Sequence, residues 1–521
     1  MSGGGRMAGQ TLVRAEYLIA DPSRGAAGTI RDAALVIDGN TIAAVGPWSE
    51  LEPRYRHLTP LGGPDGWLAI PGLVNAHHHG RGVSTLCVGM ADAPLELWLP
   101  EFILYRGYDV HANTLYAATR MLRSGITTSI ESHLGAGPLP TFCDGVEASL
   151  RAYRDAGARV AFAVGCYEQQ EVTYLNAEGW LARLPETLRQ EVRARLDYAR
   201  IRLTVDEYLE AFERFHARCA TEFPLARVML NPRGLQWASE AFLRRVAETA
   251  ARHQAGIHTH LLETLYQRTY AERRFNASAV DVLERSGLLG PRTSVAHAVW
   301  VTGRDVERLA ATQTTVVTNA SSNLRLGSGV VPLNALRARG VNVAVGLDSA
   351  TLFDDDDMLK EMRLVATLHR RGALGETWLS PYEALAMATV GGARAALLEG
   401  QIGRLLPGYR ADLTILDMTR VREGYVDPRA DLPALALARA QTADVDTVIV
   451  DGEVLLRGGR FTRLDERQVA AALRESWQAH EAERNGEAAE FLTKLRPHLV
   501  AAYEGWESSA YDPYVSINSR T

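Results

Sequence analysis

The chain contains little cysteine, little lysine and no long apolar run, and each of these scarcities excludes a class of protein or of metal site. Its four cysteines are widely spaced with no C-x-x-C pair, which favours reduced thiols in a cytoplasmic protein over a disulfide framework: Cys87, Cys143, Cys166 and Cys219. No apolar stretch is long enough to span a bilayer, and the Gly-rich amino terminus lacks the apolar centre of a secretory signal. We therefore expect a cytoplasmic protein without a membrane partner.

Strong charge of one sign is also absent. The formal net charge is -6, and no block of basic residues resembles a nucleic-acid-binding arm. The densest charge run, the four aspartates at 354–357, is typical of a solvated loop. No nucleic-acid partner is therefore expected.

Strand and helix patterns alternate through the middle of the chain, which is typical of βα units around a parallel sheet. Eight such units predict an α/β fold of the (β/α)8, or TIM, barrel type. A polar, helix-patterned insertion over 168–223 is either a lid, an oligomer contact or simply a set of surface helices. The eight predicted strands lie within 68–79, 125–133, 159–167, 226–234, 256–263, 294–300, 314–320 and 341–349.

The two flanks of the barrel have a different texture, with short strands and turns such as the D-G-N hairpin signal at 38–40. Neither flank is large enough to bury a core alone, so we expect both to pair into one small discontinuous β-sandwich. The chain is thus predicted to divide into an N-terminal half of the sandwich (1–66), the barrel (67–400), a C-terminal half of the sandwich (401–462) and a C-terminal helical extension (463–521).

Histidines and carboxylates follow several predicted strands where these strands end. His77 and His79 are two residues apart on one strand, so both side chains point to the same face. The carboxyl ends of barrel strands converge on one face, where active sites form. Four residues make a zinc-type ligand set there: His77, His79, His260 and Asp348.

Two neighbouring histidines need a separate interpretation. His78 lies between the two ligands and should point away from them, so we expect it to be structural. His258 repeats the two-residue spacing before His260, so either could be the ligand of this strand. We favour His260 because Glu263 then lies just beyond it, and we assign His258 a supporting or packing role.

The predicted metal is a divalent ion, zinc or alternatively Fe²⁺, that converts bound water to hydroxide near neutral pH. Asp348 would be both a ligand and the first proton acceptor. Glu263 would carry the proton to a departing nitrogen, and His297 would orient the hydroxide or polarise the substrate. The predicted catalytic residues are therefore Glu263, His297 and Asp348.

Five motifs together resemble the amidohydrolase superfamily, in the branch of cytosine-deaminase-like, guanine-deaminase-like and triazine-hydrolase-like enzymes. They are PGLVNAHHH, HTHLLET, VAHAVW, SSNLRLGSG and GLDSATLFDDDDMLKEMR. The resemblance implies the same metal ligands and the same roles for Glu263 and His297. Binuclear members bridge two metals with a carboxylated lysine on strand four. Here the only lysines are Lys360 and Lys494, so one metal is expected.

The sequence departs from the deaminase pattern in two places. Relatives often carry His-Cys-Pro or His-Asn-Pro before the SSN segment, where this chain has Thr318-Asn319-Ala320. After Asp348, relatives often have a small polar run with asparagines, where this chain has SATLFDDDD. Both differences fall where relatives contact substrate. Further candidate pocket residues are Trp98, Glu101, His133, Gln236, Trp237 and Asn323.

These features predict an enzyme that hydrolyses a non-peptide C–N bond of a small molecule. The favoured reaction is hydrolytic deamination of a neutral, moderately apolar N-heterocycle. One alternative is hydrolysis of a urea, carbamate or amide that releases an amine. A second alternative is a catalytically inactive barrel that serves as a binding partner. A homo-oligomer, a dimer or larger, is also expected.

Overall fold

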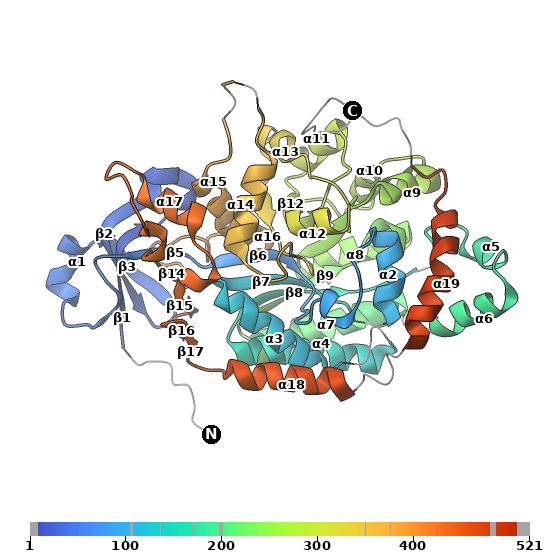
Figure 1. Cartoon of the computed structure of the whole chain (residues 1–521), viewed down its shortest axis with the longest axis horizontal. Helices are drawn as coiled ribbons and strands as arrows, with labels where there is room; N and C mark the ends of the chain where they lie inside the picture. Colours follow the sequence, from blue (N-terminus) through green and yellow to red (C-terminus); the bar gives the residue numbers. More distant parts are fainter. Residues whose placement is uncertain are drawn as a thin grey trace.

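The computed structural model describes residues 9–104, 108–135, 137–169, 172–196, 202–349, 351–372, 374–375, 377–479 and 486–507. In these residues the strands form two sheets, a parallel barrel sheet and a mixed sheet built from both flanks of the chain (Figure 1). This arrangement confirms the predicted α/β fold with a discontinuous β-rich unit.

The barrel sheet contains eight parallel strands in chain order. The last strand returns to the first, because the Asp348 amide donates to the His77 carbonyl oxygen at 2.9 Å. The strands are β6 Leu73–His78, β7 Ile126–Ser132, β8 Arg159–Gly165, β9 Ala226–Asn231, β10 Ile257–Leu261, β11 Thr293–His297, β12 Thr315–Thr318 and β13 Val343–Val345.

Helices surround the barrel sheet, and several begin at residues suited to cap them. Thr204 and Glu207 form a reciprocal capping box at the start of α7, and Asp109 accepts from the Ala112 amide at the start of α3. The helices are α3 Val110–Arg123, α4 Leu139–Ala156, α7 Val205–Glu222, α8 Glu240–His253, α9 Leu265–Phe275, α10 Ala279–Arg285, α11 Gly303–Ala311, α12 Ala320–Arg325, α13 Leu333–Ala338, α14 Met358–Leu368, α15 Pro381–Ala386 and α16 Gly392–Ala395.

The mixed sheet joins strands from the two ends of the chain, as predicted. Its order is β17-β16-β15-β14-β5-β1-β2-β3, with β4 beside β1. Helices α1 Trp48–Tyr55 and α17 Leu432–Arg439 belong to the same flanks. The strands are β1 Thr11–Ile19, β2 Thr29–Asp38, β3 Thr41–Pro47, β4 Pro60–Gly62, β5 Trp67–Pro71, β14 Leu413–Asp417, β15 Val445–Val450, β16 Glu453–Arg457 and β17 Arg460–Phe461.

One predicted strand is divided between the two sheets. The segment predicted as continuous over 68–79 forms β5, which pairs with β1 and β14, and then β6, which begins the barrel. Gly72 lies between them, and a Cβ there would come within 2.2 Å of the Thr127 hydroxyl. A bare backbone is therefore required where the chain passes from one sheet to the other.

The insertion and the C-terminal extension pack against each other, although they are far apart in the sequence. Helices α5 Ala177–Leu181 and α6 Glu186–Arg195 share an apolar cluster with α19 Gly486–Ala502. The Trp180 indole donates to the His498 carbonyl oxygen at 2.9 Å. Helix α19 also lies beside α2 Leu95–Leu104, and α18 Glu466–Ala479 lies beside α3 (Figure 1).

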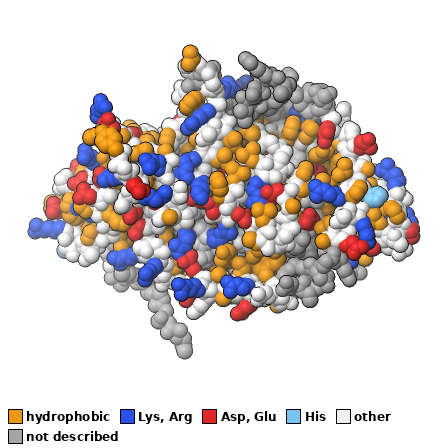
Figure 2. Space-filling view, in the orientation of Figure 1, with side chains coloured by type: hydrophobic (Ala, Val, Ile, Leu, Met, Phe, Trp, Pro, Cys, Tyr) orange, Lys and Arg blue, Asp and Glu red, His pale blue; other side chains and the backbone are white. Residues whose placement is uncertain are grey.

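Acidic and basic side chains are interspersed on the face shown in Figure 2. Among the described helices, none combines the length and apolar character needed to cross a membrane. All four cysteines are free thiols, as the sequence predicted. Assembly into a homo-oligomer stays a prediction.

Candidate active site

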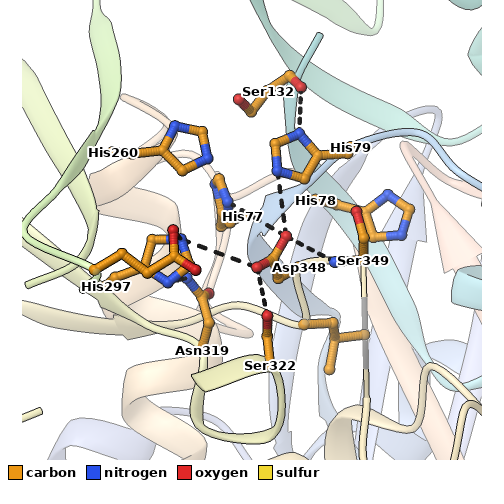
Figure 3. A network of polar contacts seen from close by, with 12 residues as sticks. His77, His78, His79, Ser132, His260, His297, Asn319, Ser322, Asp348 and Ser349 are labelled. Carbon is orange, nitrogen blue, oxygen red and sulfur yellow. Dashed lines mark hydrogen bonds and ion pairs between the residues drawn. The ribbon is translucent and has the colours of Figure 1, made fainter. Parts of the chain in front are cut away.

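Four side chains at the carboxyl ends of three barrel strands, β6, β10 and β13, converge on one point (Figure 3). The Asp348 Oδ1 atom lies 3.2 Å from His79 Nε2 and 3.7 Å from His77 Nε2. The ring of His260 lies 4.9 Å from that of His77, and one ligand atom from each of His77, His79 and His260 falls within 4.8 Å of the others. The predicted ligand set is thus brought together.

Backbone carbonyl groups orient two of these imidazoles. His79 Nδ1 donates to the Ser132 carbonyl oxygen, and His260 Nδ1 donates to the Arg233 carbonyl oxygen, each at 2.7 Å. Since a carbonyl only accepts, both rings carry their proton on Nδ1. Each Nε2 lone pair is therefore available to a cation, which is the usual way in which proteins prepare a histidine ligand.

His258 supports His77 from behind. Its Nε2 atom lies 2.7 Å from His77 Nδ1, and its Nδ1 atom lies 2.7 Å from the Ser294 hydroxyl. Burial lowers the pKa of His258 to about 3, so this ring is neutral. With both nitrogens engaged by protein groups, His258 is positioned to orient His77 and not to ligate.

The environment of these histidines fits a divalent metal ion. His77 Nε2 is buried and has no hydrogen-bond partner in the described part of the chain. Burial, above all, lowers the pKa values of His77 and His260 well below the usual histidine range, so both are neutral donors. Three imidazoles with one carboxylate form a donor set suited to zinc and similar metals.

Asp348 is held as an anion. Burial alone would raise its pKa, but the adjacent His79 and His77 rings hold the pKa of this carboxyl well below its usual range. Its Oδ2 atom accepts from the Ser322 hydroxyl at 2.7 Å, and Oδ1 accepts from the Ser349 amide at 2.7 Å. The residue has φ 57°, a strained conformation of the kind that clusters at active sites.

Glu263 and His297 lie beside the metal-ligand cluster. Glu263 Oε2 is 3.6 Å from His297 Nε2, which is 3.9 Å from Asp348 Oδ2. Burial raises the pKa of Glu263 to about 7, although the adjacent His297 opposes the change. A carboxyl with this pKa can both accept and donate a proton near neutral pH. His297 Nδ1 is 2.9 Å from Asn323 Oδ1 and 3.3 Å from Asn319 Nδ2.

His297 is also close enough to be considered as a ligand. One ligand atom from each of His77, His297 and Asp348 lies within 4.8 Å of the others. Its Nδ1 contacts with two asparagine side chains leave Nε2 facing both Glu263 and Asp348. This position between two carboxylates suits a proton-handling group, and we keep the role predicted from the sequence.

An apolar cavity opens onto these groups. Helix α2 provides one wall with four side chains, and strand ends, α12 and the loops after the strands provide the rest. The apolar and aromatic lining residues are Leu95, Trp98, Leu99, Phe102, Leu134, Tyr167, Trp237 and Leu326, and the polar ones are His79, Arg233, His260, Glu263, His297, Ser322, Asp348 and Ser349.

The candidate substrate residues are placed differently from one another. Trp98 and Trp237 line the cavity. Asn323 contacts His297, as described above. Gln236 lines a neighbouring cavity on the other side of Trp237, and His133 packs against Phe162 with a ring separation of 5.0 Å, outside the lining.

One candidate pocket residue, Glu101, and the histidine predicted to be structural, His78, complete the comparison with the sequence predictions. Glu101 is half-buried on α2 and, among the described residues, is not part of the cavity lining. His78 accepts from the Gly80 amide at 2.9 Å, and burial lowers its pKa to about 4, which agrees with a structural role.

Sequence reasoning missed Arg233 and Tyr167. The Arg233 guanidinium lies over the Tyr167 ring, 4.1 Å from its centre, and donates to the Tyr167 hydroxyl at 2.8 Å. Both residues follow barrel strands, β9 and β8. Their position just after strand ends was the signal that could have identified them.

Comparison with known proteins agrees with this geometry. A model described as "Amidohydrolase family" matches residues 68–455, and one described as "Imidazolonepropionase-like composite domain, bacteria" matches residues 33–57. A 5-methylthioadenosine/S-adenosylhomocysteine deaminase of Moorella thermoacetica is 32% identical over 85% of this chain and 97% of its own length. A 5'-deoxyadenosine deaminase of Methanothermobacter thermautotrophicus is 32% identical over 87% and 96%.

Solved structures share the fold at lower sequence identity. An adenosine deaminase from Xanthomonas campestris with bound zinc superposes with a TM-score of 0.74 at 24% identity, covering 90% of this chain and 98% of its own. Atrazine chlorohydrolase from Arthrobacter aurescens TC1, complexed with zinc, gives 0.75 at 24% identity, covering 90% and 100%. Since the family model spans most of the sequence, the chain belongs to the amidohydrolase family and is a metal-dependent hydrolase that acts on carbon–nitrogen bonds.

Proposed function

We propose that the protein hydrolytically deaminates a neutral amino-substituted N-heterocycle, with adenine nucleosides that lack a charged 5' group as the first class to test. The observation that carries this proposal is Glu263, a buried carboxyl with a pKa of about 7 beside His297 and the metal-ligand cluster. The relatives named above, a 5-methylthioadenosine/S-adenosylhomocysteine deaminase and a 5'-deoxyadenosine deaminase, support adenine nucleosides as the substrate class.

We further propose that one zinc ion is held by His77, His79, His260 and Asp348. The buried His77 Nε2 atom, which has no hydrogen-bond partner among the described residues, and the Nδ1 protons fixed by backbone carbonyls support this set. When bound, the metal would acidify water and so supply a nucleophile near neutral pH. The lack of lysine anywhere except Lys360 and Lys494 supports a single ion.

The protein groups around the cluster supply the proton transfers. Asp348, which is ionised before the reaction, accepts a proton from the attacking water. Glu263 then protonates the amino nitrogen, so that the C–N bond breaks and ammonia departs while the ring carbon keeps the water oxygen. His297 lies between these two carboxylates and stabilises the oxygen that gains negative charge.

The cavity wall supports a neutral, partly apolar substrate. Trp98, Phe102 and Trp237 present aromatic surface, which a charged or fully polar molecule would leave unused. Burial of apolar substrate area against this surface contributes about 25 cal/mol per Å². A 5'-methylthio or 5'-deoxy group is neutral and apolar, whereas free guanine and cytosine offer no such group.

Release of an amine from a urea, carbamate or amide is the second candidate. The observation that favours it is again Glu263, because this carboxyl can protonate a substituted nitrogen as readily as an amino group. An inactive binding barrel is wrong, since family membership and the metal site identify a hydrolase.

The test is a panel assay on zinc-loaded protein that measures both ammonia and arylamine release. The panel holds 5'-deoxyadenosine, 5'-methylthioadenosine, guanine, cytosine and an aryl urea. We expect ammonia from the two nucleosides at kcat/KM of about 10⁴ M⁻¹s⁻¹ or more, the lower range of ordinary enzymes. Arylamine from the urea without ammonia from any heterocycle would overturn the proposal, and efficient turnover of guanine or cytosine would contradict the inference about the apolar wall.

A further inference from the structure

The first turn of α12 and the residue before it contact two of the three proposed catalytic residues, Asp348 and His297. The Ser322 hydroxyl donates to Asp348 Oδ2 at 2.7 Å (Figure 3). The side chains of Asn323 and Asn319 lie 2.9 Å and 3.3 Å from His297 Nδ1. The orientation of His297 and Asp348 therefore depends on where this single segment, residues 319–323, is held.

A carboxyl group from another helix holds this segment. Asn319, the residue before α12, makes no capping hydrogen bond with its side chain. Instead Glu361 of α14 accepts from the Ser321 amide at 2.9 Å and from the Ser321 hydroxyl. Glu361 thus satisfies donors that a helix start otherwise leaves without a partner.

The burial of Glu361 is costly for the fold. Its side chain is only 2% exposed, and among the described residues it forms no ion pair with lysine or arginine. Burying a carboxyl with hydrogen bonds alone contributes little to the free energy of unfolding. We therefore attribute the presence of Glu361 to the geometry that it imposes on residues 319–323. Through residues 319–323 this geometry determines the contacts of His297 and Asp348.

We propose that Glu361 is a positioning residue for the hydrolytic reaction, acting through residues 319–323 to set the orientation of His297 and Asp348. The inference rests on the proposed function for the roles of those two residues. It assigns a purpose to a buried carboxylate that neither contacts the metal-ligand cluster nor lines the cavity.

Three variants separate positioning from simple support of the fold. Glu361→Ala removes both acceptors. Glu361→Gln keeps an acceptor for the Ser321 amide and can donate to the Ser321 hydroxyl. Asp305→Ala is the matched control, because Asp305 is also 2% exposed and caps α11 through Thr302, but its cap contacts no residue of the site.

The experiment measures kcat, KM, zinc content and thermal stability of each variant on the best substrate. Glu361→Ala should keep its zinc and lose about 10–100-fold in kcat, the usual effect of losing a supporting hydrogen bond at a metal site. KM should change by less than about threefold, because ground-state binding is untouched. Glu361→Gln should stay within about threefold of the unaltered protein in kcat. Asp305→Ala should lose stability without losing kcat.

A second measurement does not depend on the substrate. In metal-free protein, hydrogen exchange of the amides in 319–326 should be faster in Glu361→Ala than in Asp305→Ala, and the ¹⁵N signal of His297 Nδ1 should shift. If the proposed substrates fail, these signals still test the inference. If Glu361→Ala does not fold, Ser321→Ala, which removes only the hydroxyl, should give a smaller loss of the same kind.

Unchanged kcat in folded Glu361→Ala, with only a lower melting temperature, would overturn the proposal. So would Glu361→Gln as defective as Glu361→Ala, since the charge and not the position would then matter. Unaltered hydrogen exchange and an unaltered His297 signal would overturn it independently of any substrate.

Discussion

Replacing Glu263 by glutamine should raise stability and abolish most activity at the same time. The carboxyl pKa rises from an ordinary 4.5 to about 7 because the side chain is buried. Between pH 4.5 and pH 7, Glu263 therefore keeps its proton in the folded, metal-free protein but has released it in the unfolded chain. The contribution of Glu263 to the free energy of unfolding falls as pH rises from about 4.5 to 7, by up to about 3 kcal/mol.

Glutamine has nearly the same shape as glutamate and no charge to desolvate. The free energy of unfolding of Glu263→Gln therefore does not fall in this way as pH rises. Urea unfolding of metal-free protein should show the variant gaining about 2–3 kcal/mol over the unaltered protein between pH 5 and pH 8.5. Zinc-loaded Glu263→Gln should keep its metal and lose about 10²–10⁴-fold in kcat, because no group carries the proton to the leaving nitrogen.

The control is Glu248→Gln, which changes an exposed glutamate on α8. It should leave both the pH dependence of unfolding and kcat unaltered. An equal stability difference between Glu263→Gln and the unaltered protein at both pH values would refute the statement that burial keeps Glu263 protonated. Near-normal kcat would refute its role as the proton carrier.

Other regions give further expectations. His258→Ala should weaken zinc binding about 10–100-fold in a chelator competition, because His77 loses its orienting partner, while unchanged affinity would deny that support. Arg159→Leu should cost about 3–5 kcal/mol in urea unfolding, because it leaves the buried Asp412 carboxylate unpaired. Leu495→Ala should cost about 2–5 kcal/mol and raise KM, since α19 supports the α2 wall of the cavity. A changed kcat at constant KM in Leu495→Ala would contradict the support of the α2 wall by α19.

The sequence was sufficient for the features that depend on local patterns. The alternation of strands and helices predicted the barrel, and the His77/His79 spacing placed both side chains on one face. Glu263 and Asp348 were found because barrel strands all end at the same face. The pairing of both flanks into one β-rich unit followed from the small size of each flank.

Features that depend on contacts between distant residues could not be predicted. The carbonyl groups of Ser132 and Arg233 orient two histidines, but any residue has a carbonyl group. His133 resembled a site residue because it follows a strand, yet it packs outside the cavity lining. The packing of α19 against the insertion joins segments about 300 residues apart, and its apolar residues alone do not identify their partner.

The most direct test is a titration of zinc into metal-free protein while ammonia release from 5'-deoxyadenosine is measured. The four ligands His77, His79, His260 and Asp348 can form one site, so activity should rise linearly and stop at one zinc per chain. A requirement for two zinc ions per chain, or ammonia release that does not depend on added metal, would contradict the account.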